Sequence, residues 1–190
     1  MILVRHGQTT YGAEGRFQGC KEEVYLSPLG RKQAEAVGKA LFPLSVCSPV
    51  FCSPMVRCQQ TAGRIYHAYN VLQDLRDVDV GCFAGLTQAE VQERFPSYWR
   101  KMEDNLFFWR FPGGESLLSV FLRVTHALKT LPSNAIVVSH EAVLKCMLAF
   151  LLGMNPLCYR RLTIDECSIT TFDGKRRLVK LNDTMHLREL

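Results

Sequence analysis

Short apolar runs rich in β-branched residues alternate along this chain with longer stretches of helical apolar spacing. The runs predict strands and the longer stretches predict helices. Strands that alternate with helices are typical of a sheet with helices packed on its faces. We therefore expect an α/β fold with three layers, α/β/α, and a mostly parallel central sheet. The expected strands are 2–4, 45–52, 135–139, 164–172 and 178–181, and residues 71–72 and 75–80 are expected to be extended. The expected helices are 28–41, 54–66, 88 onward, 116–131 and 141–152.

Local signals support several of these boundaries. Ser27-Pro28 is typical of a helix start, and Thr87 to Glu90 has the pattern of a capping box. Asp173-Gly174 predicts a tight turn between the last two strands. No linker or repeat divides the chain, so we expect a single domain over 1–190, with a cap or loop region around 87–116. Residues 100–114 are expected to be irregular, with an aromatic cluster that serves as core or lid.

Composition narrows the class of protein. The chain has 190 residues, 47% hydrophobic and 22% charged, which is enough for a core without disulfides or metal. Its eight cysteines include no Cys-x-x-Cys pair, and no signal-peptide pattern is found at the start, so we expect reduced thiols and a cytoplasmic location. The net charge of +5 lacks a dense basic stripe, and the apolar run 142–152 is too short to span a bilayer. We expect neither nucleic acid nor membrane as a partner.

Two histidines follow expected strands: His6 comes after 2–4, and His140 after 135–139. Arg5 precedes the first histidine, and Arg57 lies in the first turns of the helix after 45–52. Ligands of open α/β sheets bind at the carboxyl ends of strands. Arginine binds phosphate through charge-assisted hydrogen bonds, and neutral histidine can act as a nucleophile. These side chains predict a site for phosphoryl transfer.

Three carboxylates are candidates for a general acid. Asp77 and Asp79 could share one face of an extended segment. Glu115 is either a helix cap or a residue of a substrate loop. No metal site is expected, because the histidines and carboxylates lack the close spacing of metal ligands. Arg16 and Arg123 are expected to form structural ion pairs.

Five ordered blocks resemble the histidine phosphatase superfamily, also called phosphoglycerate mutase-like. They are Leu3 to Thr9 with Glu14 to Gly19, Leu26 to Gln33, Cys52-Ser53-Pro54 with Arg57, Leu75 to Thr87, and Phe111 to Ser116 with Val137 to Glu141. The resemblance implies that His6 becomes phosphorylated, that Arg5, Arg57 and His140 surround the phosphate, and that Gln18 and Gly19 contact the substrate. It implies no metal and no cofactor.

Two positions depart from the family pattern. Asp77 stands where relatives usually carry a glutamate acid, and Gly12 where they usually carry asparagine. The block at 75–85 resembles the branch of broad-specificity and α-ribazole phosphatases. We expect a phosphomonoester hydrolase with a phosphohistidine intermediate and a small-molecule substrate, α-ribazole 5'-phosphate being one candidate. The alternatives are a phosphoglycerate mutase and a non-catalytic protein that binds a phosphorylated ligand. The sequence leaves the oligomeric state open.

Overall fold

A six-stranded sheet forms the centre of the computed structural model, which describes residues 1–190. The strand order is β3-β2-β4-β1-β5-β6. The first four strands in this order run parallel, whereas β5 is antiparallel to both β1 and β6. The expected mostly parallel sheet is confirmed. The strands are β1 Ile2–Arg5, β2 Val50–Cys52, β3 Tyr69–Val71, β4 Ile136–Ser139, β5 Ile169–Phe172 and β6 Leu178–Asp183.

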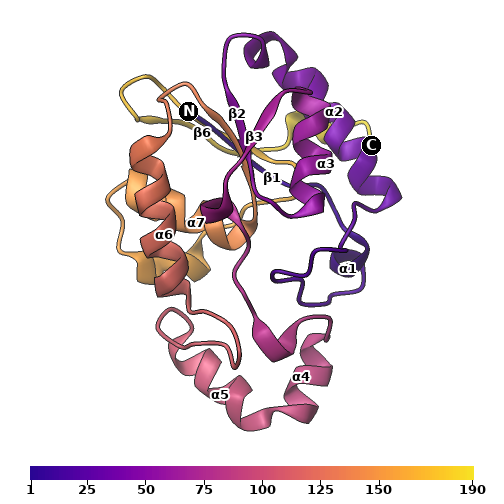
Figure 1. Cartoon of the computed structure of the whole chain (residues 1–190), viewed down its shortest axis with the longest axis vertical. Helices are drawn as coiled ribbons and strands as arrows, with labels where there is room; N and C mark the ends of the chain where they lie inside the picture. The colour runs from indigo at the N-terminus through magenta and orange to yellow at the C-terminus, as the bar shows by residue number, and fades with distance from the viewer.

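Helices cover both faces of this sheet (Figure 1). Helices α2 (Pro28–Ser45) and α3 (Val56–Ile65) lie on one face, and α6 (Leu117–Thr130) and α7 (Glu141–Leu151) lie on the other. Alternate residues of β1 enter the two cores: Leu3 packs with α6 and α7, whereas Val4 packs with α2 and α3. The three-layer α/β/α expectation is confirmed. No helix is both long and apolar enough to cross a membrane.

The helices α4 (Gln88–Arg94) and α5 (Pro96–Asn105) lie together at one end of the molecule, beyond the layers (Figure 1). Thr87 caps α4 in a capping box with Glu90, as expected. The expectation of irregular chain from residue 100 was wrong, because α5 continues to Asn105. Pro96 starts this helix, and Met102 is buried on its inner side. A short helix, α1 (Thr10–Ala13), follows β1.

Two expected strands, 45–52 and 164–172, were too long. Helix α2 continues to Ser45, so β2 begins only at Val50. The segment 75–80 contains no strand: a 3-10 helix over Gln73–Leu75 is followed by irregular chain. The carbonyl oxygens of Asp74 and Asp77 accept hydrogen bonds from the Arg123 side chain. Of 164–172, only Ile169–Phe172 is a strand.

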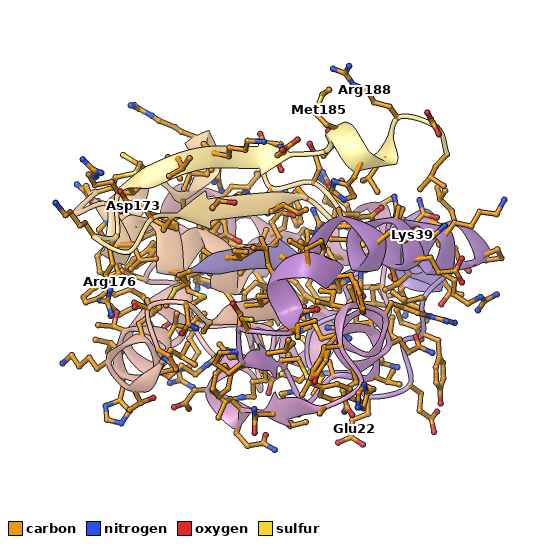
Figure 2. The ribbon with its side chains drawn as sticks, turned by 90° about the horizontal axis from the view of Figure 1, so that it is seen from above. Glu22, Lys39, Asp173, Arg176, Met185 and Arg188 are labelled. Carbon is orange, nitrogen blue, oxygen red and sulfur yellow. The ribbon has the colours of Figure 1, made fainter.

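The last two strands form a hairpin whose turn is stabilised by Asp173. Its carboxylate accepts hydrogen bonds from the backbone N–H groups of Lys175 and Arg177, each at 2.9 Å. Figure 2 shows Asp173 at one end of this hairpin and Met185 at the other. The 3-10 helix Met185–Leu187 packs against α2. The C-terminal turn therefore joins the α2 layer.

Candidate active site

Three neighbouring parallel strands end at the same edge of the sheet. Ser53 follows β2, His140 follows β4 and His6 follows β1, in that spatial order. The backbone N–H of His6 donates to Ser139 O at 3.0 Å, and that of Ser53 donates to Val138 O at 3.0 Å. These bonds extend the sheet by one residue. They place the two imidazole rings edge to face, with centroids 5.1 Å apart.

The ring of His6 is held in one orientation. Nδ1 lies 2.8 Å from the carbonyl oxygen of Gly7, so Nδ1 carries the proton and donates it to this bond. Nε2 keeps its lone pair, and His6 lines a cavity. Burial, the Arg57 charge and the Arg5 charge lower the pKa of His6 well below its usual value. The imidazole is therefore neutral at pH 7 and able to act as a nucleophile.

Arg5 is held from two sides. Its Nη1 donates to Ile164 O at 2.6 Å and lies 3.1 Å from a carboxylate oxygen of Glu141. The N–H of Cys167 donates to the carbonyl oxygens of Arg5 and His6, at 3.1 and 3.3 Å. The Nε of Arg5 is buried and has no hydrogen-bond partner. The segment before β5 thus supports the end of β1, and Arg5 retains an unused donor.

Arg57 is fully buried at the start of α3. Its Nη2 donates to Gly19 O at 2.7 Å and to Asp77 Oδ2 at 3.0 Å, and its Nε has no partner. Gly19 has a φ of +52°, and a Cβ at this position would lie 2.6 Å from a methyl carbon of Val80. Only glycine fits there, so its carbonyl can reach the guanidinium.

Both ring nitrogens of His140 have partners. Nε2 lies 2.7 Å from the Ser53 hydroxyl, and Nδ1 lies 3.4 Å from Asp77 Oδ2. Burial and the nearby Arg57 charge lower the pKa of His140 well below its usual value, so the contact with Asp77 is not an ion pair. An ionised carboxylate can only accept, so Nδ1 carries the proton beside Asp77, and Nε2 accepts from the Ser53 hydroxyl, which itself accepts from the Met55 N–H. In that tautomer, Nδ1–H faces Asp77.

Asp77 occupies the centre of this cluster. Its Oδ1 accepts from the Val78 N–H at 2.9 Å, and its Oδ2 accepts from Arg57 and faces His140. Burial raises the pKa of Asp77, and the Arg57 charge opposes that rise. The Asp77 carboxylate thus contacts Arg57 and His140, the same two side chains that a bound phosphate oxygen would contact. A bound phosphate would favour the protonated, neutral form of this acid.

The other two acid candidates lie outside the cavity lining. Glu115 pairs with Arg123, with Oε1 2.8 Å from Nη2, and also accepts from the Asp79 N–H. Asp79 Oδ1 accepts from the Gly81 N–H. Arg123 also donates to Asp77 O at 3.0 Å. Glu115 and Arg123 therefore fix the backbone that carries Asp77, and the position of Glu115 does not support the expected contact with substrate.

The cavity beside His6 has a volume of about 450 Å³. Gln18 and Gly19 contribute to its wall, and Gln18 Oε1 is buried without a partner. A Cβ at Gly12 would lie 3.3 Å from Gln18 Nε2, so Gln18 approaches the space that a side chain at residue 12 would fill. The residues that line the cavity are Arg5, His6, Arg16, Phe17, Gln18, Gly19, Asp77, Val78, Val80, Gln88, Trp99, Met102, Leu106, Phe111, Leu117, His140, Glu141, Ala142 and Tyr159.

Sequence reasoning gave no role to Ser53, Glu141, Trp99 or Met102, which contact the catalytic groups or line the cavity. Ser53 could have been found because it directly follows a strand, as His6 does. No local signal marked the α5 side chains. The expected ion pairs of Arg16 and Arg123 are present. No group of three His, Cys, Asp or Glu side chains is placed to hold a metal ion.

Residues 1–184 match the model of the histidine phosphatase superfamily, branch 1. Phosphoserine phosphatase 1 of Hydrogenobacter thermophilus is 31% identical over 201 aligned positions, covering 100% of this chain and 94% of that protein. A probable phosphoglycerate mutase of Salmonella choleraesuis is 33% identical, covering 91% of this chain and 84% of its own length. The bifunctional 6-phosphofructo-2-kinase/fructose-2,6-bisphosphatase of Caenorhabditis elegans is also similar, but the match spans only 33% of that protein.

Solved structures show the same fold. A mycobacterial glucosyl-3-phosphoglycerate phosphatase with bound VO3 has a TM-score of 0.81 and 27% identity, covering 97% of this chain and 98% of that one. A putative α-ribazole-5'-phosphate phosphatase of Escherichia coli has a TM-score of 0.85, covering 96% and 95%, but its 21% identity shows the fold alone. This chain belongs to the histidine phosphatase superfamily. By class of enzyme it is a phosphatase.

Proposed function

We propose that the protein hydrolyses small-molecule phosphomonoesters in two steps, through a phosphohistidine at His6. The orientation of His6 carries this proposal. Its Nδ1–H is bound to Gly7 O, its Nε2 lone pair is free, and its low pKa keeps it neutral. Nε2 attacks phosphorus, the bond from phosphorus to the ester oxygen breaks, and the alcohol leaves. Water then attacks the phosphohistidine, which releases inorganic phosphate and restores His6.

The phosphate is bound by Arg5, Arg57 and His140 in this proposal. The Nε–H donors of both arginines are buried and unpaired, and phosphate oxygens would satisfy them. Nδ1–H of His140 donates to an oxygen that becomes more negative as phosphorus is attacked. Gln18 and Gly19 form the adjoining wall. The positive side chains compensate the phosphate charge, so chelation of divalent metals should leave the rate unchanged.

Asp77 serves as general acid and base. It donates its proton to the departing ester oxygen in the first step, and its carboxylate removes a proton from the attacking water in the second. Burial already raises its pKa in the free protein. Residues 87–116 act as a cap on a single catalytic domain, since Gln88, Trp99 and Met102 reach the cavity. A cytoplasmic location is part of the proposal and is supported by eight free cysteines.

Trapping of the intermediate tests this proposal. The protein is mixed with a phosphate ester carrying radiolabelled phosphate, and the reaction is quenched in alkali, where phosphohistidine survives. The label should map to His6 by peptide mass spectrometry, and His6→Ala should lack both the label and the turnover while keeping the wild-type circular dichroism. Label on Ser53 or Cys58 would refute the assignment.

A phosphoglycerate mutase is the second candidate, favoured by the similarity to the Salmonella protein. A mutase must protect its phosphohistidine from water and pass the phosphoryl group to a second hydroxyl. Inorganic phosphate that forms as fast as substrate disappears, with phosphoglycerate present as acceptor, would identify a phosphatase. The remaining candidate is a protein that binds a phosphorylated ligand without turning it over. It would apply if the departures at Asp77 and Gly12 had abolished catalysis, and no labelled intermediate would then form.

A further inference from the structure

The cavity beside His6 is polar at one end and apolar over most of the remaining wall. Arg5, His6, Asp77 and His140 form the polar end. The other wall comes from segments far apart in the sequence, including α5 and the irregular chain at Val78 and Val80, before the 3-10 helix Gly81–Phe83. Most of its side chains are aromatic or aliphatic, among them Phe17, Val80, Trp99, Met102, Phe111 and Tyr159, and its polar ones include Arg16, Gln18 and Gln88. The phosphate end is therefore followed by a surface that favours an apolar group.

The charged groups of the cavity are already paired. Arg16 contacts Glu14 at 2.7 Å and Glu90 at 3.0 Å. Arg5 contacts Glu141, and it is the only other cation among the lining residues. Glu141 is also paired with Lys145, whose Nζ lies 4.8 Å from the centre of the Tyr159 ring. Apart from Arg5, which binds the phosphate in our proposal, no cation that lines the cavity is free to pair with a second anionic group of a substrate.

We infer that the site selects phosphomonoesters whose leaving alcohol is uncharged and carries an apolar, preferably flat aromatic, group. A second anionic group would lose water against an apolar wall without gaining a free cation. A ring placed between Trp99, Met102 and Phe111 would instead bury apolar surface. The inference rests on the proposed hydrolysis at His6 and defines its substrate class.

Substrates with alcohols of similar basicity isolate the effect of the leaving group. We would compare kcat/KM for 2-phenylethyl phosphate, ethyl phosphate, 3-phosphoglycerate and phosphoserine. The phenyl ring should raise kcat/KM about ten- to hundredfold above ethyl phosphate, the usual worth of one buried apolar side chain. The two acids should fall at or below ethyl phosphate. A preference of tenfold or more for either acid over ethyl phosphate would overturn the inference but leave the hydrolysis intact.

Variants of two cap aromatics locate the selectivity. Trp99→Ala should remove most of the advantage of 2-phenylethyl phosphate over ethyl phosphate, and a circular dichroism spectrum equal to that of the wild type would show that the variant is folded. Trp99→Phe should keep part of the advantage. Phe108→Ala is the matched control, because Phe108 is 53% exposed and lies outside the cavity lining. Equal loss in Trp99→Ala and Phe108→Ala, or no loss in either, would refute the assignment. Absence of turnover with all four esters would overturn the proposed function as well.

Discussion

The substitution Asp77→Asn tests the role of the shortened acid most directly. Asparagine keeps an oxygen that can accept from Arg57, so the local geometry should survive. It removes the proton that an alkyl ester needs, because an alkoxide is a poor leaving group. Loss of a general acid usually costs ~10²–10⁴-fold, and we expect that loss in kcat on ethyl phosphate. On p-nitrophenyl phosphate the loss should be less than about tenfold, because a nitrophenolate leaves without a proton.

The change in KM follows from the position of the carboxylate. Asp77 Oδ2 lies 3.0 Å from Nη2 of Arg57, the guanidinium that also binds phosphate in our proposal. The Asp77 carboxylate and a bound phosphate repel each other. Two unit charges about 4 Å apart interact with ~4 kcal/mol at an effective dielectric constant of 20. The Arg57 and His140 contacts offset part of this repulsion. Removal of the negative charge should therefore lower KM for both esters while kcat falls for one of them.

Steady-state kinetics on both esters, with Asp79→Asn as control, would test whether Asp77 is the general acid. Asp79 lies two residues away and outside the cavity lining, so its variant should keep the wild-type ratio of the two kcat values. Equal losses of kcat on both esters in Asp77→Asn would mean that Asp77 shapes the site without donating a proton. Selective loss in Asp79→Asn instead would reassign the acid.

Three further outcomes are expected. First, because the pKa of His6 is lowered, the acid limb of phosphohistidine formation in single-turnover kinetics should lie below pH ~6.5, and a limb at or above pH 7 would contradict this. Second, His6 and His140 both have lowered pKa values in the folded state, so the unfolded chain binds protons first as pH falls below ~6.5. The free energy of unfolding should fall by up to ~1.4 kcal/mol per pH unit for each histidine, and His140→Asn should give a shallower slope in urea titrations between pH 6.5 and 5. Third, Ser53→Ala should lower kcat about tenfold with little change in KM and shift the ¹⁵N resonances of His140, because the tautomer loses its partner; unchanged resonances would exclude that role.

The layers and the placement of His6 and His140 could be predicted because they depend on local patterns. A β-branched run that ends at a polar residue fixes both the strand and the edge at which that residue lies. Asp77 was placed beside the phosphate site only by resemblance, since alternation along a strand assumed a strand that does not exist.

The remaining features depend on contacts between distant segments. The backbone around Asp77 is shaped by Arg123 and Glu115, which lie 46 and 38 residues further along the chain, and neither pairing leaves a local signal. The cavity wall from Trp99 and Met102 depends on how α5 docks over the strand ends, and the part of this helix from residue 100 onward was expected to be irregular chain. Sequence periodicity identifies a helix or strand and its apolar face, but it does not show which other segment packs against that face.

The place of β1 in the sheet also sets when activity can arise during synthesis. His6 is synthesised well before β4 and β5, which are the two strands that pair with β1. The Cys167 N–H that holds the Arg5 and His6 carbonyls arrives later still than His140. A nascent chain that stops before β5 therefore carries its nucleophile without the support that orients it. Productive folding must wait for contacts of high sequence separation, so turnover cannot begin before β5 has been synthesised.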